Sequence, residues 1–191
     1  MADITEENEI SLIVEDGSCV PNANCYVSLE FADEYMKNTG RKDWLSLSDN
    51  DKKSYLINAT NYIDRTYGKL GWKGIKKYHR KQSLCFPRVE LFDKDGYEVE
   101  GIPEELMKAV CEAGFISTTT SLFSIKDASG TIKSQKVDVL EVEYYSEKDS
   151  SGEYISRFTV LDYLLADFYK TKNSGNRVKR AIHTDILGGV I

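Results

Sequence analysis

The sequence has few histidines and none of the familiar metal or nucleotide motifs. Its 191 residues include only two histidines, His79 and His183, and four cysteines, none of which form a C-x-x-C pair. Structural zinc sites need such closely spaced ligands, so no metal is expected. The G-x-G-x-x-G, P-loop and G-x-S-x-G patterns of dinucleotide-binding, NTP-binding and hydrolase proteins are also missing. We therefore expect no cofactor and no enzymatic activity.

Long apolar runs are missing as well. No stretch approaches the roughly 18 consecutive apolar residues that span a bilayer, and the opening MADITEE is acidic rather than signal-like. With 41% hydrophobic and 11% aromatic residues, the chain can still bury a core. The composition predicts one ordered domain with no membrane partner, made inside the cell. Its four cysteines are expected to be reduced and partly buried.

A net charge of −6 hides two basic segments in an otherwise acidic chain. Residues 69–81 hold six basic residues and no acid, and residues 170–180 hold five and no acid. Such segments favour docking on an acidic partner, either nucleic acid or protein, although a solvated loop is an equally open interpretation. The first segment is a candidate patch for nucleic acid or a neighbouring copy, with the residues Lys73, Lys76, Lys77, Arg80 and Lys81.

Hydrophobic spacing predicts a mainly α-helical fold with minor β structure, built as a small helical bundle. Apolar residues recur at steps of three and four in four places, which predicts four helices. Ser28 and Ser48 are the expected N-caps of the first two helices, Pro103 the first residue of the third, and Leu161 lies in the fourth.

Two short β elements are expected beside the helices. Residues 10–14 (ISLIV) read as a strand that is closed by the turn sequence EDG. A strand or hairpin is expected near 132–145, because Leu140, Val142 and Tyr144 alternate with other residues there.

Residues 68–103 lack a sustained period and are rich in turn residues, so a structured, loop-rich crossover is expected. Within it, DKDG at 93–96 resembles part of a calcium loop. Leu91 and Ile102 occupy positions where such a loop needs carboxylates, so a tight turn is expected instead. Trp72 is flanked by glycines and is expected to pack the loop onto the core, with base stacking as the less favoured alternative.

Several short motifs follow one another in a characteristic order along the chain. They are IVEDG at 13–17, ANCYVS at 23–28, YID at 62–64, WKG at 72–74, LCFPR at 84–88, DG at 95–96, IP at 102–103, IKSQKV at 132–137 and LEVEY at 140–144. Their order resembles that of tailed-bacteriophage head-to-tail adaptor proteins, a family whose members are often labelled DnaT-like single-stranded DNA-binding proteins. Phe86 stands where that family usually has tryptophan.

The resemblance implies a virion protein at the head–tail junction. Members form a ring, commonly dodecameric, beneath the portal, so the implied partners are the portal protein, neighbouring copies, and a tail or nozzle protein below. Genomic DNA would pass through the ring without specific binding. The implied organisation is a helical adaptor domain at 1–172 and an extended C-terminal arm at 173–191 that docks on the portal. The implied portal-binding residues are Arg177, Lys179, Arg180, Ile182, Ile186 and Leu187.

An alternative function is sequence-tolerant binding of single-stranded DNA. Trp72 and Tyr78 are interleaved with the basic residues of 69–81, as base stacking beside phosphate contacts requires. This alternative predicts an affinity that falls steeply with salt, because each phosphate contact releases a counterion.

Overall fold

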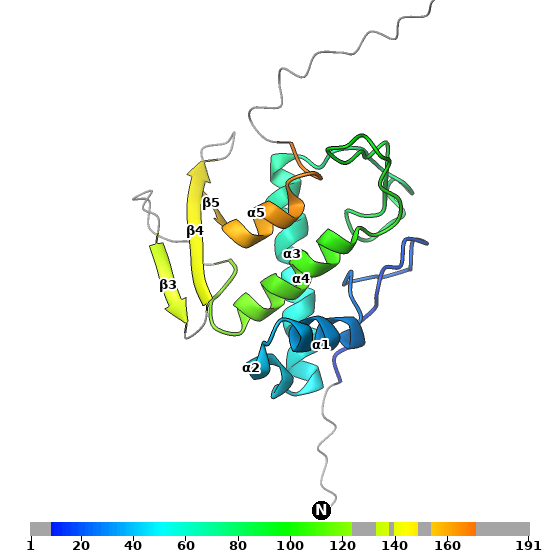
Figure 1. Cartoon of the computed structure of the whole chain (residues 1–191). Helices are drawn as coiled ribbons and strands as arrows, with labels where there is room; N and C mark the ends of the chain where they lie inside the picture. The colour runs from blue at the N-terminus through cyan, green and yellow to red at the C-terminus, as the bar shows by residue number, and fades with distance from the viewer. Residues whose placement is uncertain (1–8, 124–132, 138–139, 149–153, 171–191) are drawn as a thin grey trace, which may run out of the picture.

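The computed structural model describes residues 9–123, 133–137, 140–148 and 154–170 (Figure 1). Five helices lie within these ranges. They are α1 (Leu29–Asn38), α2 (Lys42–Leu45), α3 (Asp49–Leu70), α4 (Glu104–Ser117) and α5 (Thr159–Leu165). The prediction of a mainly α-helical fold with minor β structure is confirmed.

The helix starts follow from local capping. Ser28 Oγ accepts a hydrogen bond from the Phe31 amide at 3.2 Å, and Ser48 Oγ accepts one from the Asp51 amide at 3.2 Å, so both predicted N-caps are confirmed. Pro103 is the N-cap of α4 and the helix begins at Glu104, one residue after the predicted start at Pro103. The four-residue α2 was not predicted, because it is too short to show a hydrophobic period.

The core forms where α3 packs against α4. Leu56 and Trp44 are fully buried at this contact. A Cβ on Gly114 of α4 would lie 3.3 Å from Leu56 Cδ2 and 3.6 Å from the Trp44 ring, so the glycine permits the close approach. Figure 1 shows α4 and α5 lying across the long α3.

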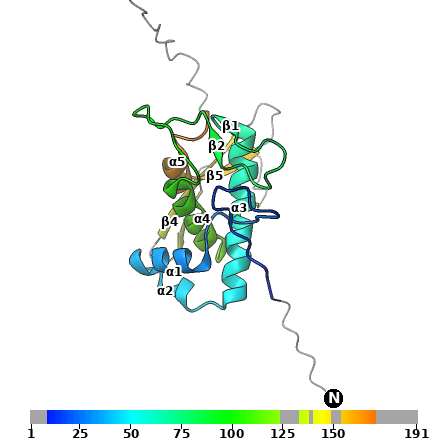
Figure 2. The same cartoon turned by 90° about the vertical axis from the view of Figure 1, so that its right-hand side faces the viewer.

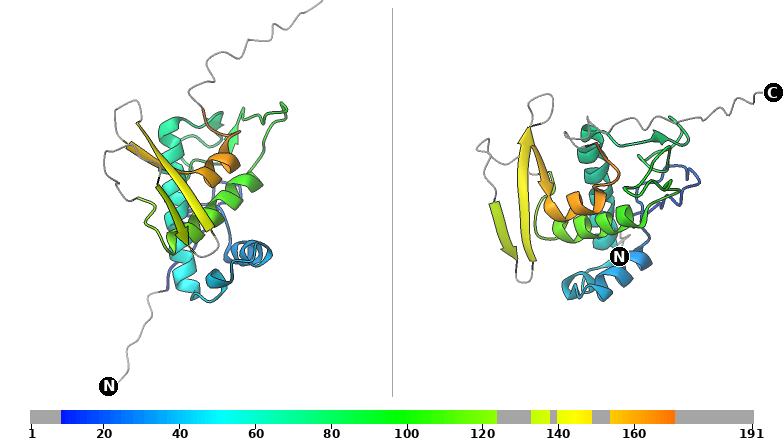
Figure 3. Two further views of the ribbon diagram at one scale, coloured as in Figure 1. Left: turned by 60° about the vertical axis from the view of Figure 1, so that its left-hand side comes forward. Right: turned by 45° about the horizontal axis from the view of Figure 1, so that its top comes forward.

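A three-stranded antiparallel sheet lies beside the helices. Its strands are β3 (Lys133–Val137), β4 (Leu140–Lys148) and β5 (Tyr154–Phe158), in the order β3-β4-β5. The hairpin predicted near 132–145 corresponds to β3 and β4. Figures 1 and 3 show this sheet on the opposite side of the helices from the long crossover that joins α3 to α4.

The N-terminal segment forms less β structure than the sequence predicted. The strand expected at 10–14 is reduced to one bridge between Val14 and Cys25, because its backbone groups pair with the polar loop that follows.

The four cysteines are free, with Cys25 and Cys111 buried, as predicted.

Candidate nucleic-acid interface

The crossover begins where Gly71 ends α3 with a φ of +95°. The chain then forms β1 (Ile75–Lys76), which pairs antiparallel with β2 (Arg88–Val89). Gly74 makes this pairing possible, because a Cβ there would lie 2.5 Å from the Val89 carbonyl oxygen. Figure 2 shows the two short strands beside the C-terminal end of α3.

Arg88 ties the crossover together through three backbone carbonyls. Its guanidinium donates from Nε to Lys73 O at 2.6 Å, from Nη2 to Gly74 O at 2.8 Å and from Nη1 to Cys85 O at 3.0 Å. Burial lowers the pKa of Arg88 below its usual value. The planar fork suits this arrangement, because its donors have fixed directions.

Gln82 also holds the loop by hydrogen bonds from its side chain to backbone groups. Its buried amide donates to Leu84 O at 3.0 Å and Pro87 O at 3.2 Å, and its Oε1 accepts from the Tyr78 amide at 3.0 Å. Both sides of the loop between β1 and β2 are therefore held by side chains rather than by regular secondary structure.

Tyr26 and Asp64 fix the same loop to the core. The Tyr26 hydroxyl donates to Asp64 Oδ1 at 2.7 Å, and the Cys85 amide donates to Asp64 Oδ2 at 2.9 Å. Burial raises the pKa of Tyr26, of Asp64 and, to about 11, of the Cys85 thiol. Tyr26 is buried, so these hydrogen bonds join the crossover to α3 away from the surface.

Trp72 packs inside the protein, as the sequence predicted. Its side chain is 7% exposed, stacks on Tyr67 with ring centroids 5.9 Å apart and meets Phe86 edge-on at 5.0 Å. Burial removes this ring from the surface, so the alternative prediction that Trp72 stacks on bases is wrong.

The predicted basic patch divides into one structural residue and an exposed loop. Lys73 donates from Nζ to Asp167 O at 2.7 Å, so it anchors the end of the domain. We call residues 76–81 the basic loop. Lys77, Arg80 and Lys81 are exposed on it and make no ion pair with any residue that the structure describes. Lys76 is half-buried near Asp64.

Tyr78 stands beside these cations. The Lys77 ammonium lies 5.5 Å from the centre of its ring, and its hydroxyl lies 3.5 Å from the Gly17 carbonyl oxygen. The ring is half-buried. Because Gln82 binds the Tyr78 amide and Arg88 binds backbone carbonyls on both sides of the loop, the backbone of the basic loop is held before any ligand arrives.

The structure brings the starts of the two basic segments together. The Lys170 amide donates to Gly71 O at 2.9 Å, and the Lys73 amide donates to Phe168 O at 2.8 Å. Lys170, the first residue of the second segment, therefore lies beside Gly71 of the first. The six residues predicted to bind a portal, Arg177, Lys179, Arg180, Ile182, Ile186 and Leu187, lie outside the described residues, as does the predicted arm.

Sequence reasoning missed two exposed aromatic rings on a hairpin at 91–99. Phe92 is 50% exposed and Tyr97 73% exposed. The tight turn predicted at 93–96 is present, since Asp93 Oδ1 accepts from the Asp95 and Tyr97 amides at 2.9 Å each. The turn signal located the hairpin, but the exposure of its aromatics depends on where the hairpin projects from the fold.

The described residues hold no cluster of metal ligands and no membrane-spanning helix. They contain no group of three or more histidine, cysteine or acidic side chains that could hold a metal ion. None of their helices is both long and apolar enough to cross a bilayer.

The geometry thus defines a small, mainly helical domain that presents a rigid cationic loop. The chain belongs to the family described as "Putative DnaT-like ssDNA binding protein", whose model matches residues 10–181. That range includes every described helix and strand. No curated protein and no solved structure matched the chain.

The predicted phage head-to-tail adaptor is wrong, because the family that matches carries the description "Putative DnaT-like ssDNA binding protein" and not that of an adaptor. The predictions of portal and tail partners, a ring of copies and DNA passing without specific binding are overturned with it. The motifs behind the resemblance have structural roles. Residues 23–28 end in the N-cap of α1, and residues 84–88 hold the crossover. They report the fold rather than what its surface binds.

Proposed function

We propose that this protein binds single-stranded DNA without sequence preference, and that it acts as a binding protein rather than an enzyme. The observation that carries the proposal is the basic loop, where Lys77, Arg80 and Lys81 are exposed without an ion pair in the described part of the chain. The description of the matching family supports it.

The chemistry of the basic loop suits a phosphate backbone. Its side chains are long, positively charged donors on a loop that Arg88 and Gln82 hold in place. Cations of this kind contact phosphates whatever the base sequence, which explains binding without sequence preference. The acidic remainder of the chain would confine DNA to this surface, since like charges repel.

The proposal is tested by fluorescence anisotropy with a labelled oligothymidylate of about 30 nucleotides, longer than one site of about 4–16 nucleotides. We expect Lys77→Glu/Lys81→Glu to weaken binding at least tenfold. Lys37→Glu/Lys42→Glu is the matched control, because both of its lysines are exposed and it changes the net charge equally. Equal losses in the two double variants, or no binding by the wild type, would overturn the proposal.

A further inference from the structure

We infer that the hairpin at 91–99 is the base-stacking part of this site, through the rings of Phe92 and Tyr97. The inference rests on the proposed function and adds to it the side chains that contact bases. With Trp72 buried, an aromatic platform for bases must come from elsewhere in the chain.

The two rings are exposed on a hairpin that is already ordered. Phe92 pairs with Glu98, the Asp93 amide donates to Tyr97 O at 2.9 Å, and the Val99 amide donates to Leu91 O at 2.8 Å. The Asp93 side chain closes the turn. A ring that is held before binding loses little conformational freedom when a base stacks on it.

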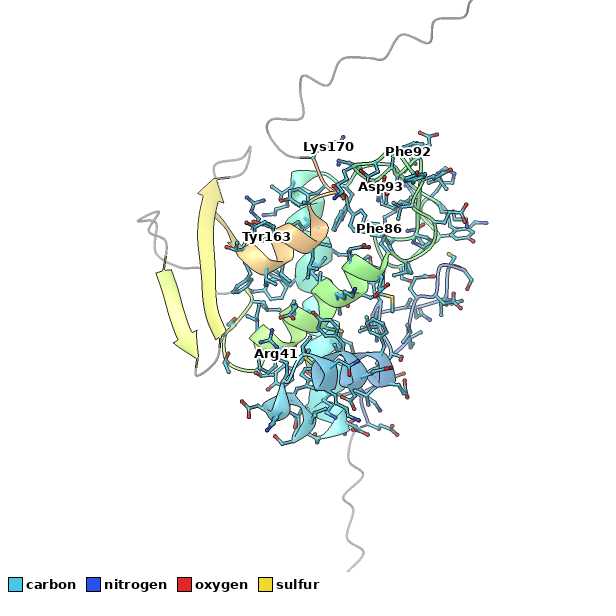
Figure 4. All side chains as sticks on the ribbon, in the orientation of Figure 1. Arg41, Phe86, Phe92, Asp93, Tyr163 and Lys170 are labelled. Carbon is cyan, nitrogen blue, oxygen red and sulfur yellow. The ribbon has the colours of Figure 1, made fainter. Side chains whose placement is uncertain are left out.

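The hairpin projects from the same short ladder as the basic loop. Leu91, which is 1% exposed, packs against Gly74, where a Cβ would lie 3.1 Å from Leu91 Cβ. In this ladder Lys76 pairs with Arg88 at one end and Ile75 pairs with Val89 at the other. Phe92 follows Val89 by three residues. In Figure 4, Phe92 lies along the same upper edge of the molecule as Lys170. Lys77 lies three residues after Gly74, which Leu91 contacts, and three residues span about 10 Å at most, so DNA could contact both features.

The charge of the hairpin indicates that the hairpin and the basic loop contact different parts of the DNA. Asp93, Asp95 and Glu98 outnumber Lys94 there, so the hairpin repels phosphates. The basic loop therefore takes the phosphates, while the hairpin faces the bases.

The test compares Phe92→Ala/Tyr97→Ala with Tyr163→Ala. Tyr163 is the matched control, because it is 81% exposed on α5, away from the hairpin (Figure 4). We expect the double variant to weaken oligothymidylate binding about tenfold or more, since base–aromatic stacking contributes about 1–3 kcal/mol per base. The dependence of affinity on salt should stay unchanged, because no phosphate contact is lost. Phe92→Trp/Tyr97→Trp should bind like the wild type.

Two results separate the inference from the proposed function. If Phe92→Ala/Tyr97→Ala binds within about twofold of the wild type while Lys77→Glu/Lys81→Glu loses binding, the stacking inference is overturned and the proposed function survives. If the wild type does not bind the oligothymidylate, the proposed function fails and the inference fails with it. Circular dichroism and thermal unfolding of each variant check that a lost affinity is not a lost fold.

Discussion

The helical body and the crossover at 71–103 are ordered by different interactions. In the body, apolar residues such as Leu56 and Ala113 are removed from water where α3 meets α4. In the crossover, the half-buried guanidinium of Arg88 and the buried amide of Gln82 donate to backbone carbonyls outside the helices. The loop can therefore be rigid while its lysines stay in water, so stability and binding should respond to different substitutions.

The largest expected loss of stability follows a substitution in the helical body. Leu56→Ala should destabilise the fold by about 2–5 kcal/mol, because Leu56 is fully buried against α4 and its removal leaves a cavity. Urea denaturation measures the loss. Leu45→Ala is the control, since Leu45 is 42% exposed and should cost less than about 0.5 kcal/mol. A similar small loss for both variants would contradict the packing described for α3.

A substitution in the crossover should cost less stability but also affect binding. Arg88→Lys keeps the charge but cannot donate to all three carbonyls, so we expect a loss of about 1–3 kcal/mol. DNA affinity should fall several-fold without any change in net charge, because the basic loop is no longer held.

The control for that variant is Arg65→Lys, at an exposed position on α3. It should leave both stability and affinity close to the wild-type values. If Arg88→Lys destabilises the protein but binds DNA with unchanged affinity, the link between the polar scaffold and the binding surface is wrong.

The smallest expected effect is a pH dependence at the contact between the crossover and α3. Burial raises the pKa of Asp64 above 3.8, although hydrogen bonds from Tyr26 and Cys85 oppose the shift. The folded state therefore binds a proton more tightly than the unfolded state does. The resulting stabilisation is complete below about pH 3.8 and is lost as pH rises through the folded-state pKa.

Asp64→Asn removes this titration. The difference in unfolding free energy between the wild type and Asp64→Asn should shift against the wild type as the pH rises from about 4. Denaturation curves of the two proteins, collected across that range at constant ionic strength, measure the difference. A difference that does not change with pH would show that Asp64 has the same pKa in both states.

The sequence predicted the helical body well and the crossover only in outline. Periodicity and caps such as Ser28 and Ser48 report local interactions, so four of the five described helices could be placed. The roles of Arg88 and Gln82 depend on carbonyls from several parts of the crossover, and no spacing encodes them. Composition likewise could not separate Lys73, which is bound to Asp167 O, from the exposed Lys77.

The predicted family and partners show the same limit. Motifs such as LCFPR at 84–88 are specific because they build the crossover, and they could not identify the ligand. The separation of charge along the chain was more informative about the ligand. Much of one basic segment is exposed, and the first residue of the other segment lies beside it.

The most direct test of the account is the salt dependence of single-stranded DNA binding. Three exposed cations on the basic loop predict a slope of about −2 in a plot of log affinity against log salt, since each phosphate contact contributes about −0.7. The slope should fall to about −0.7 in Lys77→Glu/Lys81→Glu and stay unchanged in Lys37→Glu/Lys42→Glu. A wild-type affinity that does not depend on salt, or a slope that Lys77→Glu/Lys81→Glu leaves unchanged, would contradict the central claim that the basic loop binds the DNA backbone.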